Sequence, residues 1–161
     1  MRIGAHMRIS RGLDAAVTLL MENSAGAGNS VGWRFEELRA ILDSLSEHSD
    51  RLGVCLDTAH LWGAGYDISG PHAVPATLTE FDSLVGLERL RMLHLNDTHV
   101  GLGSRSDRHA NIGTGNIGTR GFTALVRHPA LQALPGVIET PARTIEDDVR
   151  DIGVSKRLRG D

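Results

Sequence analysis

The sequence predicts an α/β fold built on a parallel β-sheet, and three observations lead to this prediction. Short apolar segments recur along the 161 residues, and they are continuous rather than alternating, which is typical of strands buried on both faces. Segments with helical periodicity separate them, and strands that alternate with helices form βα units. No linker or repeat divides the chain, so we expect a single domain over residues 1–161.

Each expected element rests on its own local pattern. The strand segments are short apolar runs, and they are Met1–His6, Thr18–Asn23, Leu52–Asp57, Leu90–Asn96 and Val137–Thr140. The helical segments carry apolar residues on one face, and they are Phe35–Ser46, Thr77–Leu87 and Gly121–Arg127. Two glycine-rich stretches, Ala25–Gly32 and Gly113–Gly118, follow strands and are expected to be loops.

Composition excludes several classes of protein. A single cysteine, Cys55, excludes a disulfide framework and cysteine-rich zinc modules. No segment has the roughly 20 apolar residues of a membrane span, and the first residues contain no apolar signal core. We therefore expect a cytoplasmic protein that does not enter a membrane. The net charge of −3 argues against a broad basic surface for nucleic acid, although bound divalent cations would offset it locally.

The ends of the expected strands carry acids and histidines, and a parallel sheet brings these ends to one edge. The residues are Glu22, Asp57, His60, His94, Asp97 and Glu139, and the loop Asp97–Ile112 adds Asp107 and His109. A lone acid here commonly caps the next helix, and a lone histidine is more often structural than a ligand. Four strand ends bearing such groups together instead indicate a site for several Zn²⁺ or Mn²⁺ ions.

Longer motifs make the sequence recognisable. Gly53–His60 (GVCLDTAH) and His94–Gly118 (HLNDTHVGLGSRSDRHANIGTGNIG) resemble signatures of the endonuclease IV family, the zinc-dependent apurinic/apyrimidinic endonucleases. Met21–Gly28 (MENSAGAG), Val137–Pro141 (VIETP) and the opening Arg2–Asp14 are similar to further pieces of that family in the same order.

The resemblance implies a TIM-type (β/α) barrel, here incomplete with about five of eight strands, and a centre of three zinc ions. The implied activity is that of base excision repair: hydrolysis of the phosphodiester 5′ to an abasic site in double-stranded DNA. Glu22 matches the glutamate that bridges the first and second zinc ions. The other ligands of the second ion match Asp57, His94 and Glu139, and those of the third match His60, Asp107 and His109. Metal-bound water is the nucleophile in such chemistry, and Glu139 and Glu22 are the expected catalytic carboxylates.

Other residues have expected roles outside the two ligand sets. Arg105 and Arg108 are expected to contact DNA phosphates, or else to be solvated loop side chains. Asn96 and Asp97 are expected to orient the His94 imidazole. Cys55 is expected to be a small buried apolar residue.

The chain departs from the family in its length. A barrel of this type needs roughly 250 residues, whereas this chain has 161. The opening segment runs directly into Thr18–Asn23, where the family places its second to fourth βα units and two histidine ligands of the first zinc ion. We interpret the sequence as an internally deleted member with two ligand sets intact.

Two alternative functions remain open. The first is a metal-dependent sugar isomerase or epimerase, because such barrels share acid and histidine ligands at the strand ends. The second is a non-catalytic metal-binding relic of the family. We also expect a homodimer, because a sheet of five parallel strands leaves edges and an inner face open.

Overall fold

The described part of the chain, residues 17–142 and 144–160 of a computed structural model, contains a parallel sheet. Its order is β1 (Leu19–Glu22), β2 (Leu52–Asp57), β3 (Leu90–His94) and β6 (Gly136–Val137). All three pairings are parallel, which confirms the predicted α/β fold. The expected strand Met1–His6 lies outside the described residues.

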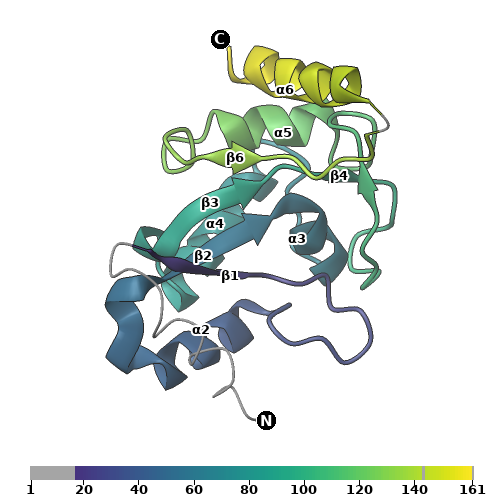
Figure 1. Cartoon of the computed structure of the whole chain (residues 1–161). Coiled ribbons are helices and arrows are strands. Elements are labelled where there is room, and N and C mark those ends of the chain that lie inside the picture. The colour runs from purple at the N-terminus through teal and green to yellow at the C-terminus, as the bar shows by residue number, and fades with distance from the viewer. Residues whose placement is uncertain (1–16, 143, 161) are drawn as a thin grey trace.

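The register of the sheet aligns the carboxyl ends of its strands. Glu22 pairs with Cys55, and Asp57 pairs with His94. His94 in turn pairs with Val137, two residues before Glu139. The carboxyl ends of these strands, which are far apart in sequence, therefore lie together at one rim of the sheet (Figure 1).

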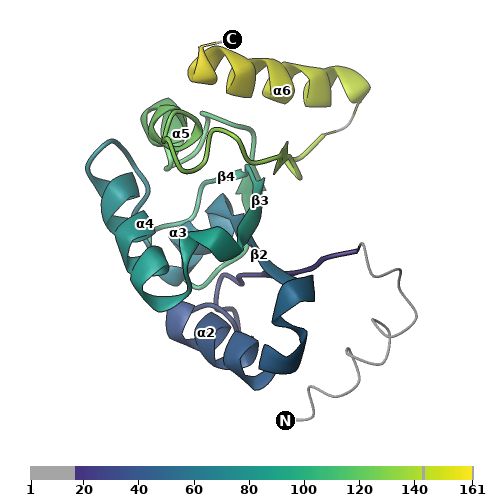
Figure 2. The ribbon, with the colours of Figure 1, turned by 90° about the vertical axis from the view of Figure 1, so that its left-hand side faces the viewer.

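Helices cover one face of the sheet. The helices α2 (Phe35–Ser44), α4 (Ala73–Leu84), α5 (Gly118–Val126) and α6 (Ile145–Arg159) each contact the next one in the row. Figure 2 shows this row from the side, whereas Figure 1 looks onto the opposite face, where β2 and β3 lie in front of α4. This is the arrangement of an outer helical layer around part of a barrel.

The core lies between the sheet and these helices. Every residue of β2 is buried, as a continuous apolar run predicts. The rings of Phe35 on α2 and Phe81 on α4 meet edge to face at 5.2 Å, and Phe35 also stacks on Tyr66 at 3.9 Å. These contacts fix α2 and α4 against one another.

Several helix boundaries differ from the sequence prediction. Helix α4 begins at Ala73 rather than Thr77 and ends at Leu84, because Pro75 lies in the first turn, where its missing N–H is not needed. Helix α5 begins at Gly118 rather than Gly121. A Cβ atom on Gly121 would collide with the Ile68 main-chain oxygen, so this glycine permits close packing rather than ending the helix.

Two helices were not predicted from the sequence. Helix α3 (Thr58–Ala64) begins directly after β2, where the Asp57 side chain accepts the N–H of His60, and ends at Gly65 with φ +103°. Helix α6 has a capping box formed by Thr144 and Asp147, but its apolar periodicity is weak. Both helices carry cap signals that were present in the sequence.

Shorter elements complete the fold. Strands β4 (Asp97–Thr98) and β5 (His109–Ala110) form an antiparallel pair, and η2 (Ser46–Arg51) and η3 (Leu87–Arg89) are 3₁₀ segments before β2 and β3. Only Val137 of the predicted strand Val137–Thr140 belongs to β6, which begins one residue earlier. The predicted strand Leu90–Asn96 shortens to β3. Among the described residues, no helix is long and apolar enough to span a membrane.

Candidate metal centre

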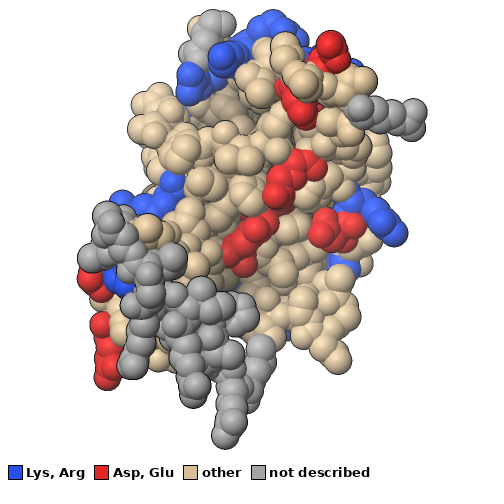
Figure 3. Space-filling model, viewed as in Figure 1, with Lys and Arg blue, Asp and Glu red and all other residues tan. Residues whose placement is uncertain are grey.

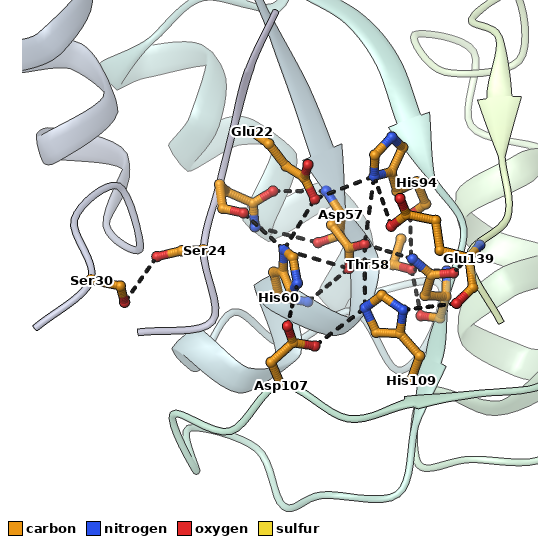
Figure 4. Close-up of polar contacts among 12 residues, drawn as sticks. Glu22, Ser24, Ser30, Asp57, Thr58, His60, His94, Asp107, His109 and Glu139 are labelled. Carbon is orange, nitrogen blue, oxygen red and sulfur yellow. Dashed lines mark hydrogen bonds and ion pairs between the residues drawn. The ribbon is translucent and has the colours of Figure 1, made fainter. Parts of the chain in front are cut away.

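Two groups of potential metal ligands meet at the carboxyl rim of the sheet (Figure 4). The first group consists of Glu22, Asp57, His94 and Glu139, and the second of Asp57, His60 and His109. Within each group the ligand atoms lie within 4.8 Å of one another. Asp57 belongs to both groups, so the two form one continuous centre.

In the first group three carboxylates surround one imidazole nitrogen. Nδ1 of His94 lies 3.2 Å from Oε1 of Glu22 and 3.2 Å from Oε2 of Glu139. Oδ2 of Asp57 lies 3.9 Å from the same nitrogen. One nitrogen and three carboxylate oxygens that converge in this way are a ligand set suited to Zn²⁺ or Mn²⁺.

Asp107 completes the second group. Its Oδ2 atom lies 3.3 Å from Nε2 of His60, and its Oδ1 atom lies 3.3 Å from Nε2 of His109. The hairpin-like loop between β4 and β5 carries Asp107 over the rim, because β5 holds His109 beside β4. Asp107 is half exposed, so this group faces solvent.

Main-chain oxygens fix the tautomers of these two histidines. Nδ1 of His60 lies 2.9 Å from the oxygen of Asn23, and Nδ1 of His109 lies 3.0 Å from the oxygen of Glu139. A carbonyl oxygen only accepts hydrogen bonds, so both Nδ1 atoms carry the proton. The Nε2 lone pairs are thereby directed at Asp107, which is the preparation typical of metal-binding histidines.

One atom of the site lacks a hydrogen-bond partner in the structure. Nε2 of His109 is buried and makes no hydrogen bond, although Asp107 and Asp57 carboxylates lie 3.3 Å and 3.7 Å away. An unprotonated nitrogen facing two carboxylates is unfavourable without a cation. The residues present therefore fit a divalent metal ion.

Asp57 is the most deeply buried acid of the centre, with a side chain 0% exposed. Burial raises its pKa, while the nearby His60 opposes that rise. The Asp57 carboxylate also accepts the N–H of His60 and the amide of Asn96, the latter at 2.6 Å. A buried carboxylate that belongs to both ligand groups is well placed to be shared by two cations.

The charges of the centre are coupled. A hydrogen bond with His60 lowers the pKa of Glu22 against the effect of its burial. Burial lowers the pKa of His60, but the hydrogen bond to Glu22 and the charges of Asp57 and Asp107 outweigh it and raise that pKa to about 9. In the metal-free protein, protonated His60 therefore supplies a positive charge among these carboxylates.

Asn23 positions two strands of the site and was missed by the sequence analysis. Its side chain accepts the N–H of Asp57 at 2.7 Å and donates to the Asp57 oxygen at 3.3 Å. It is 2% exposed. The available signal in the sequence was an asparagine directly after the apolar run that ends in Glu22.

The predicted role of Asn96 and Asp97 in orienting His94 is wrong. Asn96 instead donates to Asp57 and accepts the N–H of Glu139 at 2.8 Å. Asp97 accepts main-chain N–H groups from its own neighbour and from the glycine-rich loop, namely Thr98, Gly113, Gly115, Ile117 and Gly118. The side chains of both residues are therefore engaged by partners other than His94.

The remaining predicted residues lie near the rim. Arg105 and Arg108 are exposed in the loop between β4 and β5. Cys55 is buried in β2, where burial and the charges of Glu22 and Asp57 raise its pKa to about 12. Figure 3 shows acidic side chains in the middle of this face and basic side chains toward its edges.

The fold and the site together define a parallel α/β protein of the TIM-barrel type with metal-ligand groups at the carboxyl rim. Residues 9–157 match the model of the xylose isomerase-like TIM-barrel family. The chain belongs to that family, and within it to the endonuclease IV proteins. This confirms the resemblance drawn from the sequence.

Several similar proteins are named endonuclease 4 or endonuclease IV. A probable endonuclease 4 of Chloroflexus aggregans is 49% identical over 133 residues, which cover 83% of this chain and 46% of that protein. The probable endonuclease 4 of Methanosphaerula palustris is 42% identical over 161 residues, covering 94% of this chain and 56% of that protein. The crystal structure of endonuclease IV from Thermus thermophilus matches with a TM-score of 0.80 and 38% identity, covering 94% of this chain and 53% of that one.

The chain thus spans about half the length of the relatives it matches. The internal deletion inferred from the sequence remains a prediction.

Proposed function

We propose that this protein is a divalent-cation-dependent phosphodiesterase that hydrolyses the DNA backbone 5′ to abasic sites. One observation carries the proposal: seven acids and histidines from four strands and their loops converge on one rim. The relatives named endonuclease 4 support this reaction over others that metal-binding barrels carry out.

The residues divide into two ligand sets. Glu22, Asp57, His94 and Glu139 would hold one ion, and His60, Asp107 and His109 would hold a second beside Asp57. When bound, Zn²⁺ or Mn²⁺ supplies an activated water and stabilises charge on the attacked phosphate.

Glu139 is the proposed proton acceptor. Its carboxylate is 47% exposed, so it reaches solvent and the reacting water. Its main chain is held on both sides, because its N–H donates to Asn96 and its oxygen accepts from His109. Glu22 at the end of β1 is 36% exposed and would supply a further negative charge to the bound cations.

Arg105 and Arg108 are the proposed phosphate contacts. Both side chains are exposed, and they flank Asp107 in the sequence. The Arg108 main-chain oxygen accepts a hydrogen bond from Thr98 at 2.6 Å, which fixes where this side chain leaves the loop.

A nicking assay tests the proposal. The substrate is a labelled duplex with one abasic analogue, and the control is the same duplex without it. We expect weak cleavage that a chelator abolishes and that Zn²⁺ or Mn²⁺ restores, with Glu139→Gln inactive while still folded. No cleavage at any metal concentration would contradict the proposal and favour the relic. Isomerisation of a ketose panel would favour the sugar isomerase.

We further propose that two copies associate. Among the described residues, β1 and β6 are the edges of the sheet. Apolar side chains are exposed near both edges, with Leu19 and Val137 each about 40% exposed (39% and 41%). Open edges and apolar surface favour pairing with another chain.

A further inference from the structure

Two arginines stack on one tryptophan, and one of the two, Arg105, is two residues from the potential ligand Asp107. The guanidinium carbons of Arg34 and Arg105 each lie 4.4 Å from the centroid of the Trp33 ring. Trp33 and Arg34 end the loop that follows β1, whereas Arg105 belongs to the loop between β4 and β5. The stack therefore joins two loops that are far apart in the sequence.

Each loop is held in place by its own hydrogen bonds. In the first loop the Ser24 N–H donates to the Gly32 oxygen at 3.1 Å, and the Ser24 and Ser30 hydroxyls meet at 3.3 Å (Figure 4). In the second loop the Arg105 N–H donates to the Gly63 oxygen at 2.9 Å. The stack thus rests on ordered backbone on both sides.

Arg105 adopts a strained backbone conformation. Its φ of +53° makes it the one non-glycine residue with positive φ in the described ranges. A long side chain is disfavoured there, and such strain gathers at functional sites where the surroundings hold it. Here the strain brings a guanidinium over the indole.

The two cations lie close together, and neither is paired directly with a carboxylate. Because both lie 4.4 Å from one centroid, they are at most about 9 Å apart, which is close to the Debye length, so they repel one another most strongly at low salt. Among residues 17–142 and 144–160, no carboxylate forms an ion pair with either of them. An anion between or beside the two guanidinium groups would relieve this repulsion.

We propose that Arg34, Trp33 and Arg105 form an anion-binding platform that takes backbone phosphates of a DNA duplex beside the metal centre. The inference rests on the proposed function, which it extends by two residues, Trp33 and Arg34. Guanidinium groups bind phosphate through paired hydrogen bonds. Trp33 is the positioning residue, since cation–π contact holds both side chains in place.

The position of the platform favours a polymer over a single phosphate. Arg105 is two residues from Asp107, a ligand of the proposed second ion. Two separated cations can each contact a different phosphate of one strand, whereas a single free phosphate would engage only one small group of donors. The platform would therefore hold the backbone next to the phosphate under attack.

Fluorescence anisotropy of a labelled duplex, measured over a range of salt concentrations, tests the platform. The variants are Arg34→Gln and Arg105→Gly, because glycine tolerates the positive φ while removing the guanidinium. We expect each variant to reduce the salt slope of binding by about one and both together by about two. Trp33→Leu should reduce it as well, and Trp33→Phe should retain it. Zinc content should not change in the arginine variants.

Arg39→Gln is the matched control, because Arg39 is exposed and pairs with Asp43 on α2. An equal loss of slope in this control, or an unchanged slope in both platform variants, would overturn the proposal. In a second experiment, inorganic phosphate is added to the protein–duplex complex at matched ionic strength. If phosphate displaced the duplex completely, the platform would be a site for free phosphate instead.

The two proposals fail separately. Duplex binding that does not depend on these arginines, with cleavage retained, rejects the platform alone. Arginine-dependent binding without any cleavage rejects the proposed function and leaves the platform in place.

Discussion

Nδ1 of His109 lies 3.0 Å from the main-chain oxygen of Glu139, so two potential ligands from different strands hold each other. Glu139 belongs to the first ligand group and His109 to the second. A change at either residue therefore reaches both groups. The metal centre is best regarded as one network of hydrogen bonds rather than two independent sites.

The first prediction concerns metal stoichiometry. We expect two zinc ions per chain by elemental analysis of the purified protein. His94→Ala should lose one ion, whereas Asp57→Ala should lose both, because Asp57 belongs to both groups. Glu22→Ala should lower zinc content and Tm together, since carboxylates without a cation repel one another.

His99→Ala, at an exposed position outside both groups, is the control for zinc content. Three or more tightly bound ions per chain would contradict the first prediction.

The second prediction concerns pH. In the metal-free protein the pKa of His60 is raised to about 9 from an unperturbed value of about 6.5. A raised folded-state pKa stabilises the protein fully below pH 6.5, and this contribution is lost as pH rises through 9. The loss is at most on the order of 3 kcal/mol, since each pKa unit corresponds to about 1.4 kcal/mol.

Zinc replaces the proton on His60, so the zinc-bound protein should not share this loss. The difference in Tm between zinc-loaded and chelated protein should therefore widen from pH 6.5 to pH 9. Differential scanning fluorimetry measures it, and a constant difference across this range would refute the prediction.

Much of the site could be predicted from the sequence because its signals are local. The segments that contain β1, β2 and β3 are continuous apolar runs, and the ligands follow them directly. The parallel register then brings Glu22, Asp57 and His94 together without further information. Asp57 ends β2, which lies between β1 and β3, and this central position agrees with its membership of both ligand groups.

The positioning residues could not be predicted in the same way. Asn96 forms hydrogen bonds with Asp57 and Glu139, which lie 39 and 43 residues away in the sequence. No local sequence pattern predicts such a contact. The role assigned to Asp97 was wrong for the same reason, because its partners belong to a later loop. Helix α6 was missed because its exposed face carries apolar residues that blur the helical pattern.

The third prediction concerns Asn23. Asn23→Ala leaves the buried N–H and oxygen of Asp57 without partners, and each such loss costs about 1–3 kcal/mol. We expect unfolding in urea to show a destabilisation of about 3 kcal/mol. Asn29→Ala, at an exposed loop position, should have no measurable effect, and equal effects in both variants would rule out this role.

The fourth prediction concerns assembly. We expect light scattering to report a dimer at micromolar concentration, because β1 and β6 are open edges among the described strands. Leu19→Lys should weaken it, since a lysine on an edge strand opposes pairing. A monodisperse monomer that binds no dye for apolar surface would exclude the dimer.

The last prediction concerns Gly115, which lies against the carboxylate of Asp97. The Gly115 N–H donates to Oδ2 of Asp97 at 2.9 Å. A Cβ atom on Gly115 would collide with that carboxylate and with the Thr98 main-chain oxygen, and neither can move aside because both are buried and hydrogen-bonded. The loop would have to leave Asp97, which would then lose several N–H partners at once.

We expect Gly115→Ala to cost about 3 kcal/mol, which lowers Tm by roughly 9 °C for a chain of this size. Gly101→Ala is the matched control, because a Cβ atom there meets only open space, and its effect should stay within about 0.5 kcal/mol. A Gly115→Ala protein with unchanged Tm would show that the loop does not depend on close contact with Asp97. Because Thr98 ties Asp97 to the loop that carries Asp107, the same variant should also lose zinc from the second group before the first.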